Sequence, residues 1–354
     1  MTFYDVAIIG GGPAGLTAAA TLARQLHTAV VFDSGRYRNW MSREMHMVPS
    51  LEGKDPAEFR REAREGIAAR YGGLVEFQDA AVARVQKKGD AHFVITTSGD
   101  GSEPQGGGGT STSTATRTWR ARKLLLAVGS ADVLPRVEGF AALWGTRIFH
   151  CLFCKGYEDR GAASAGVLAV APVALPAGVM VMVAVHAAAN AAQLAEGVTL
   201  YAHGDKALAS GLKAAARRQA RWTVEARRIR RLVGVGGGGG EGEEEEEVKG
   251  GEEVKSVRVE FEDGTSRMEN FLVNQPLTVP GGPFVGQLGL ATSALGDIVA
   301  EAPFHQTSVR GVFAAGDCMT PNKVVPTAIA SGSNAAVGAS TQLQSEKYGF
   351  KSVV

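Results

Sequence analysis

The chain has 354 residues, long enough for two domains of ordinary size. Its 37 lysines and arginines nearly balance its 36 aspartates and glutamates, which argues against a nucleic-acid partner. Three cysteines are too few for a secreted disulfide scaffold, and the first residues resemble no signal peptide, so we expect a cytoplasmic protein. The uncharged stretch at residues 161–195 contains prolines and glycines, and it predicts a strand, a loop and a helix in place of a membrane span.

The first part of the chain predicts a strand–helix–strand unit. Residues 5–9 predict a buried strand, a helix runs to about Leu26, and residues 28–32 predict a second strand that ends in Asp33. Between them lies Gly10-Gly11-Gly12-Pro13-Ala14-Gly15, with the Gly-x-Gly-x-x-Gly spacing of a dinucleotide-binding turn.

Each glycine of this turn has a physical reason. Gly10 permits the tight turn, Gly12 lets backbone N–H groups approach a pyrophosphate, and Gly15 lets the helix pack on the strand. Asp33 can accept hydrogen bonds from the ribose hydroxyls of a bound dinucleotide. The alternative is a glycine-rich turn in some other α/β fold.

Two low-complexity segments, residues 98–117 and 234–253, predict insertions between paired strands, because their Gly-, Ser- and Glu-rich sequences cannot bury enough apolar surface to order themselves. The acidic run within the second segment predicts a solvated loop, with a docking tail as the alternative. The other predicted elements are a strand that ends in a tight turn at residues 124–130, strands at residues 166–170 and 198–202, and a helix at about residues 326–344.

The second motif is His150-Cys151-Leu152-Phe153-Cys154. Thiols separated by two residues can close a small disulfide ring, and the adjoining His150 and Lys155 could favour the reactive thiolate. Zinc is one alternative, but the sequence has no second cysteine or histidine pair to complete four ligands, so we expect no metal. A pair of inert thiols is another. Cys318 is a lone thiol that we expect to pack near the cofactor.

The middle region lacks the turn that a nicotinamide cofactor would need. The strand at residues 166–170 runs into Ala171-Pro172-Val173-Ala174-Leu175-Pro176, whose prolines remove backbone donors. No arginine stands at residues 201–205, after the next strand, to bind a 2′-phosphate. The middle region is therefore predicted to lack a nicotinamide site.

Taken together, residues 10–15, 124–129 and 311–317 resemble the three-part FAD fingerprint of two-dinucleotide-binding-domain flavoproteins, and the position of the Cys-x-x-Cys resembles thioredoxin reductases. The resemblance implies an α/β fold of two Rossmann-like domains, the second inserted in the first. Residues 1–130 and 276–354 would form the FAD-binding domain, and residues 131–275 the NADPH-type domain that carries the cysteines. FAD would be the cofactor.

By the same resemblance, Asp317 binds the ribityl–pyrophosphate part of FAD, and the helix near Pro326 faces the flavin. The residues expected to bind the cofactor are Gly10, Gly12, Pro13, Ala14, Gly15, Asp33, Ser34, Gly129, Gly316, Asp317, Val325 and Pro326.

Residues 150–158 and 316–326 look like the gliotoxin-type dithiol oxidases, and Lys155 replaces the acidic residue that reductases carry after the second cysteine. This resemblance implies a homodimer of secondary metabolism that oxidises a small-molecule dithiol through Cys151 and Cys154, passing electrons by way of FAD to dioxygen and releasing hydrogen peroxide. Three alternatives stay open: a reductase with an atypical nicotinamide site, another oxidase of this fold, and a non-catalytic flavin-binding protein. The dithiol is not identified, although we expect residues 45–50 and the middle domain to set specificity.

Overall fold

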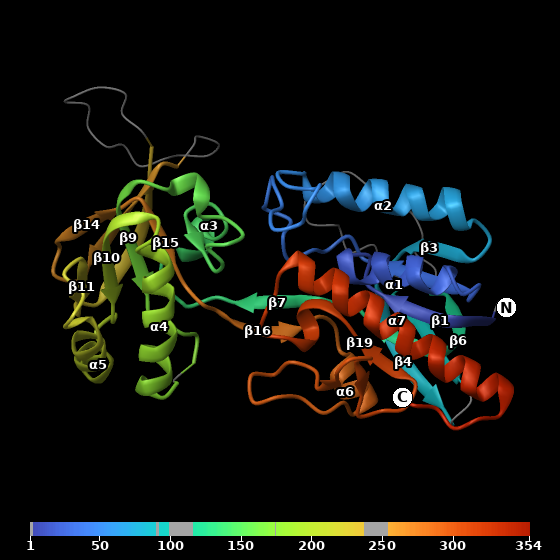
Figure 1. Ribbon diagram of the computed structural model, residues 1–354. Coiled ribbons are helices and arrows are strands. Elements are labelled where there is room, and N and C mark those ends of the chain that lie inside the picture. Colours follow the sequence, from blue (N-terminus) through green and yellow to red (C-terminus); the bar gives the residue numbers. More distant parts are fainter. Residues whose placement is uncertain (1–2, 90–91, 99–115, 174, 237–253) are drawn as a thin grey trace. The chain divides into compact units, whose positions relative to one another are not determined.

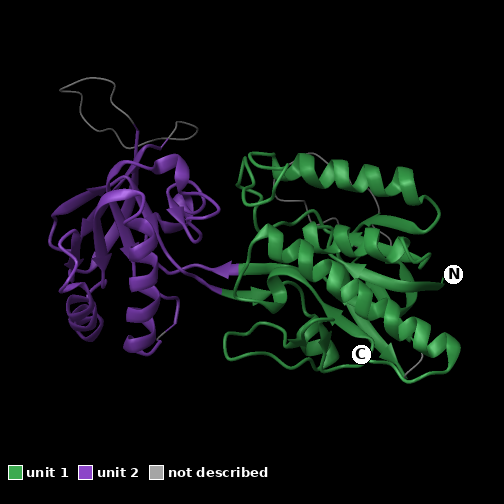
Figure 2. Cartoon of the chain, viewed as in Figure 1, with its two compact units in different colours: residues 1–131, 278–354 green, residues 132–277 purple. Residues whose placement is uncertain are grey.

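The computed structural model describes residues 3–89, 92–98, 116–173, 175–236 and 254–354. The chain divides into two compact units, shown in Figure 2: unit 1 is residues 1–131 and 278–354, and unit 2 is residues 132–277. Unit 2 is thus inserted in unit 1, as the resemblance implied. The boundaries expected after residues 130 and 275 remain predictions of where separately folding domains divide.

Unit 1 is built on a nine-stranded sheet with the order β17-β18-β19-β6-β1-β2-β3, to which β5 adds through β6, and β4 through β5. Five of its strands are parallel: β1 (Phe3–Ile9), β2 (Ala29–Asp33), β3 (Val75–Asp79), β6 (Thr118–Leu126) and β19 (Val312–Ala314). The antiparallel strands are β4 (Val82–Lys88), β5 (His92–Thr97), β17 (Ala300–Glu301) and β18 (Gln306–Thr307). The predicted first strand–helix–strand unit is confirmed, with bounds shifted by a few residues.

Helices α1 (Pro13–Ala23) and α7 (Val325–Tyr348) cover one face of this sheet, as Figure 1 shows. Their small residues pack against inward-facing side chains of the central strands, such as Ile8, Leu125 and Phe313. The opposite face is covered by side chains of β4, β5 and α6 (Phe284–Leu288). Helix α2 (Pro56–Tyr71) is preceded by its N-cap residue Asp55, whose side chain accepts hydrogen bonds from the first N–H groups of the helix.

Helices α1 and α7 approach each other closely where Gly332 meets the first turn of α1. A Cβ added to Gly332 would lie 2.2 Å from the backbone oxygen of Ala14, far inside van der Waals contact. Gly332 is buried, and helix interiors ordinarily disfavour glycine, so the residue is explained by this close approach.

Unit 2 is a parallel sheet of five strands with the order β11-β10-β9-β15-β8. Helices α4 (Ala177–Ala191) and α5 (Lys206–Ala216) pack on one face, and a three-stranded antiparallel sheet with α3 (Phe140–Leu143) packs on the other. The parallel strands are β8 (Ile148–Phe149), β9 (Ala162–Leu168), β10 (Ala195–Tyr201), β11 (Trp222–Glu225) and β15 (Phe271–Val273); the antiparallel strands are β12 (Ile229–Val235), β13 (Ser256–Phe261) and β14 (Ser266–Glu269).

The two connections between the units, β7 (Ser130–Val133) and β16 (Leu277–Pro280), pair as a small two-stranded sheet. Residues 161–195 form a strand, a loop and a helix, as predicted. Of the helices that the structure describes, none has both the length and the apolar character needed to cross a bilayer. The two predicted low-complexity insertions fall largely outside the described residues, but the strands on either side of each pair antiparallel, as predicted.

The close approach of the two helices predicts that Gly332→Ala destabilises the protein. The new methyl group would meet the Ala14 carbonyl, and overpacking of this kind costs about 1–3 kcal/mol. Thermal unfolding of the FAD-bound protein measures the effect. Gly66→Ala is the matched control, because Gly66 lies in the interior of α2 with nothing within 4 Å of an added Cβ. That variant should unfold at the wild-type temperature or above, and equal effects of the two changes would contradict the packing argument.

Candidate active site and cofactor site

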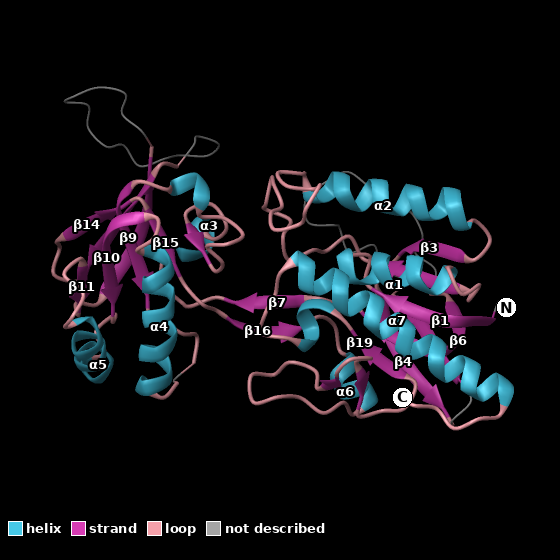
Figure 3. Cartoon of the chain, in the orientation of Figure 1, coloured by secondary structure: helices cyan, strands magenta, loops and turns pink. Residues whose placement is uncertain are grey.

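The predicted cofactor residues of unit 1 gather at one edge of its sheet. Strands β1, β2, β6 and β19 are parallel, so the segments that follow their carboxyl ends lie at the same edge. Figure 3 shows β1, β6 and β19 among the strands of this sheet. Dinucleotides bind at this edge of open α/β sheets. The segments there contain Gly10, Asp33, Gly129 and Asp317.

The glycine-rich turn has the geometry that its sequence predicted. Gly10 has a φ of +116°, and a Cβ there would lie 2.0 Å from the Ala127 oxygen. A Cβ on Gly15 would lie 1.9 Å from the oxygen of Gly10, so the helix packs tightly on the turn. Gly12 faces open space, and no side chain caps the N-terminus of α1 that follows it. This combination leaves room and backbone donors for a phosphate group.

The second fingerprint is held against the first by small residues. Residues Gly316–Met319 form the 3-10 turn η2, and the Gly316 N–H donates to Ser331 Oγ on α7 at 2.9 Å. A Cβ on Gly316 would lie 3.1 Å from that of Ala14 in α1. Val325 and Pro326 begin α7, and no side chain caps this helix N-terminus. Sequence reasoning missed Ser331 and Gly332, for which the only signal is small residues within a helix.

Asp33 lies against the turn and is fixed by its own neighbours. A Cβ on Gly11 would lie 2.0 Å from Asp33 Oδ2, which shows how close the carboxylate is to the turn. The Gly35 N–H donates to Asp33 Oδ1 at 2.9 Å, and the Tyr37 hydroxyl donates to Oδ2. Burial and the neighbouring Asp33 raise the pKa of Tyr37, so its hydroxyl stays protonated as a donor. Ser34 follows directly, at the edge where a ribose would bind.

Two cations contact the segment around Asp317. Lys323 Nζ donates to Asp297 Oδ1 at 2.7 Å and to the carbonyls of Asp317 at 2.6 Å and Thr320 at 2.7 Å. Arg38 Nη1 lies 3.6 Å from Asp317 Oδ2. Neither cation was singled out from the sequence, because the carboxylate that each contacts, Asp297 for Lys323 and Asp317 for Arg38, is distant from it in the chain. The open Gly12, the uncapped helix and the Asp33 carboxylate fit a bound dinucleotide.

The two thiols of unit 2 form a disulfide between Cys151 and Cys154, with a Cα–Cα distance of 5.2 Å. The pair follows β8, at the carboxyl edge of the unit 2 sheet. The Cys154 N–H lies 3.1 Å from Cys151 Sγ, and the Lys155 N–H donates to the Cys151 carbonyl at 3.1 Å. Both cysteines are half-buried, while Phe153 between them is 70% exposed. The sequence prediction of a small disulfide ring is confirmed.

The two candidate helpers of the thiols differ in their surroundings. The His150 ring lies near the Trp144 ring, with centroids 5.8 Å apart, and Gln275 Nε2 donates to the His150 carbonyl at 2.5 Å. The Lys155 ammonium donates to the Gly145 carbonyl at 3.3 Å and lies 5.3 Å from the centre of the Phe149 ring. Lys155 thus helps to anchor its own segment, and a catalytic role for either residue remains a prediction.

Cys318 is fully buried in η2, and its thiol donates to the carbonyls of Leu126 at 3.4 Å and Ala315 at 3.3 Å. Burial raises the pKa of Cys318 to about 12, so the reactive thiolate is not populated near neutral pH. These contacts are those of a packing residue.

The expected nicotinamide edge of unit 2 has a proline at the start of its helix. The loop after β9 leads to Pro176, which occupies the N-cap position of α4, and no side chain caps that helix. After β10 the absence of arginine holds for residues 201–205, but the structure brings another arginine nearby. The Gly204 N–H donates to the Ala226 carbonyl at 3.0 Å, and a Cβ on Gly204 would lie 3.3 Å from Arg228 Cβ. Sequence reasoning missed this neighbour because it follows a different strand.

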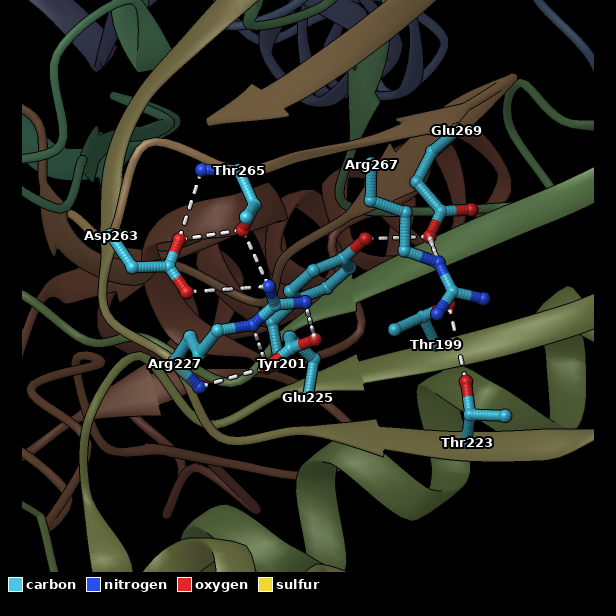
Figure 4. Close-up of polar contacts among 9 residues, drawn as sticks. All are labelled: Thr199, Tyr201, Thr223, Glu225, Arg227, Asp263, Thr265, Arg267 and Glu269. Carbon is cyan, nitrogen blue, oxygen red and sulfur yellow. Dashed lines mark hydrogen bonds and ion pairs between the residues drawn. The ribbon is translucent and has the colours of Figure 1, made fainter. Parts of the chain in front are cut away.

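The arginines beside this edge are engaged by carboxylates, as Figure 4 shows for Arg227 and Arg267. Arg227 Nη2 lies 2.5 Å from Glu225 Oε2, and its Nη1 lies 3.5 Å from Asp263 Oδ2. Arg228 Nε lies 3.0 Å from Glu262 Oε1. A phosphate would have to compete with these anions. Within the described part of the chain, we find no group of three or more His, Cys, Asp or Glu side chains that could hold a metal ion.

Comparison with known proteins assigns the chain to a family. The pyridine nucleotide-disulphide oxidoreductase model matches residues 4–332. The thioredoxin reductase tcpT of Claviceps purpurea is 40% identical over 99% of this chain and 97% of its own length. The thioredoxin reductase sirT of Leptosphaeria maculans is 34% identical over 96% of this chain and 94% of its own.

Solved structures agree in fold. The structure of HlmI is 26% identical, with a TM-score of 0.75 over 98% of this chain and 94% of that one. An oxidoreductase from Agrobacterium tumefaciens is 28% identical, with a TM-score of 0.74 over 98% of this chain and 99% of that one. The chain therefore belongs to the pyridine nucleotide-disulphide oxidoreductase family: it is an enzyme of the thioredoxin reductase-like type, with FAD as its cofactor and a redox-active disulfide.

Proposed function

We propose that this enzyme is a dithiol oxidase, which closes a disulfide within a small-molecule dithiol and passes the electrons to dioxygen. The observation that carries the proposal is the proline-bearing loop after β9, which ends in Pro176 at the start of α4 where a nicotinamide pyrophosphate would need backbone donors. Without a nicotinamide donor, the Cys151–Cys154 disulfide must receive its electrons from a thiol substrate. We propose a homodimer of secondary metabolism, and the cytoplasmic location remains a prediction.

The chemistry begins with thiol–disulfide exchange. His150 takes a proton from the first substrate thiol, whose sulfur attacks Cys151 Sγ; the Cys151–Cys154 bond breaks and Cys154 leaves as a thiolate. His150 releases this proton to solvent and then takes the proton of the second substrate thiol, whose sulfur attacks the substrate sulfur of the mixed disulfide and expels Cys151 as a thiolate. Because both thiols belong to one molecule, their effective concentration favours ring closure. The substrate is oxidised by two electrons, and the cysteine pair is reduced by two.

FAD, held by the glycine-rich turn, Asp33 and Asp317, would take these two electrons from the cysteines and deliver them to dioxygen, giving hydrogen peroxide. The uncapped N-terminus of α7, with Val325 and Pro326, supplies a positive helix end for the electron-rich reduced cofactor. The buried Cys318 takes no part, because its raised pKa keeps it a thiol.

A reductase that uses NADPH is the second candidate. It is favoured by one observation, the position of Arg228 beside Gly204 at the edge where a 2′-phosphate would be recognised. The pairing of Arg228 with Glu262, 3.0 Å away, weakens this reading because it occupies the guanidinium.

Anaerobic mixing distinguishes the two candidates. The FAD-bound enzyme is mixed separately with a small dithiol, dithiothreitol for instance, and with NADPH, and flavin absorbance is followed. We expect dithiols to bleach the flavin and NADPH to leave it oxidised. Rapid bleaching by NADPH would reject the oxidase in favour of the reductase, and no bleaching by either would leave a binding protein.

Cys154→Ser should leave the flavin oxidised when dithiol is added without oxygen. Without Cys154, Cys151 has no disulfide partner, so a substrate thiol finds no disulfide to attack and no electron pair reaches the flavin. Cys318→Ala is the control, because this buried thiol lies outside the exchange. The flavin of that variant should be reduced at the wild-type rate. If the Cys154 variant bleaches as fast as the wild type, the electrons take another path.

His150→Ala should slow flavin reduction by roughly 10²–10⁴-fold near neutral pH, the usual effect of losing a general base. The deficit should shrink as the pH approaches the ordinary thiol pKa of about 8.5, because the substrate then ionises by itself. Stopped-flow absorbance across this pH range checks both points. His186→Ala is the control, because His186 is exposed on α4. A deficit that stays constant with pH would show that His150 is not the base.

A further inference from the structure

The segment after β2 connects the two cofactor fingerprints. It begins at Asp33, which lies against Gly11 of the glycine-rich turn, and five residues later Arg38 reaches Asp317 of the second fingerprint, 3.6 Å away. Gly316, the neighbour of Asp317, abuts Ala14 in the first turn of α1. The segment therefore runs past the N-terminal end of α1, where a pyrophosphate binds in folds of this kind.

The side chains of this segment are held from both sides. The Tyr37 hydroxyl donates to Asp33, and the guanidinium carbon of Arg60 lies 3.7 Å from the centre of the Tyr37 ring. The Asn39 side chain accepts a hydrogen bond from Arg60 at 3.4 Å. Tyr37 and Asn39 are thus held by α2, and Arg38 between them contacts Asp317. The Arg38 side chain is only 12% exposed, so its position is fixed by the fold.

The charges at this place call for a cation. FAD carries a doubly charged pyrophosphate, and the carboxylate of Asp317, expected beside it, would repel it. Lys323 cannot supply the charge, because its three donors are used by Asp297, Asp317 and Thr320. A guanidinium has five donors in a planar fork and can bind a carboxylate on one edge and a phosphate on the other.

We propose that Arg38 binds the FAD pyrophosphate directly and bridges it to Asp317. The guanidinium then lies between two anions, and the first and second fingerprints are joined through the cofactor. The N-terminus of α1 contributes only partial charge, so Arg38 supplies the full positive charge of the site.

The test uses the FAD-bound enzyme and measures binding without turnover. Dilution releases FAD, whose fluorescence gives its dissociation constant, and ADP and adenosine are added as competitors that carry or lack the pyrophosphate. Arg38→Gln should raise the dissociation constants of FAD and ADP by about 10- to 100-fold, the range for losing a charged hydrogen bond, and leave that of adenosine unchanged. Arg38→Lys, which keeps the charge without the planar fork of donors, should lose less affinity for FAD and ADP.

Two further variants separate direct binding from positioning. Arg36→Gln is the matched control, an exposed arginine two residues away that should bind FAD and ADP like the wild type. In an Asp317→Asn background, Arg38→Gln should still raise the dissociation constant of ADP by a similar factor. The proposal is overturned if Arg38→Gln leaves the affinity for ADP unchanged or weakens the affinity for adenosine equally. It is also overturned if Arg38→Gln no longer weakens ADP binding in the Asp317→Asn background.

Discussion

The contact of Gly332 with the Ala14 backbone determines how the cofactor site of unit 1 is assembled. Helix α1 follows the first fingerprint, and α7 follows the last, so the distance between these two helices sets the distance between Gly12 and Asp317. A Cβ at Gly332 would lie 2.2 Å from the Ala14 oxygen, which permits no side chain there. Ser331, one residue earlier, holds the Gly316 N–H at 2.9 Å. Residues more than three hundred positions apart in sequence thereby form one edge.

Both units place their functional segments at the carboxyl edge of a parallel sheet, but these segments suit different chemistry. In unit 1 the carboxyl edge presents glycines, an uncapped helix and Asp33, which suit a dinucleotide. In unit 2 the corresponding edge presents the Cys151–Cys154 disulfide after β8 and a proline loop after β9. The retained fold with this altered edge is the physical basis on which we propose an oxidase in place of a reductase.

The sequence predicted features that are local in the chain. The glycine-rich turn, the disulfide after β8 and the proline loop follow from spacing within short segments, whereas the insertion of the second unit was implied by the family resemblance. Arg38, Lys323 and Gly332 could not be found in this way, because their partners, Asp317, Asp297 and Ala14, are distant in sequence and meet them only in the folded sheet. Arg228 was missed for the same reason: it follows β11 but contacts the turn after β10.

We propose that electrons enter this enzyme from a dithiol and leave to dioxygen without a nicotinamide. An oxygen electrode, combined with assays of hydrogen peroxide and of the product disulfide, tests it directly on the aerobic enzyme with a small dithiol and no NADPH. We expect oxygen uptake, peroxide release and disulfide formation in equimolar amounts. Oxygen uptake that requires NADPH, or disulfide formation without matching peroxide, would contradict it.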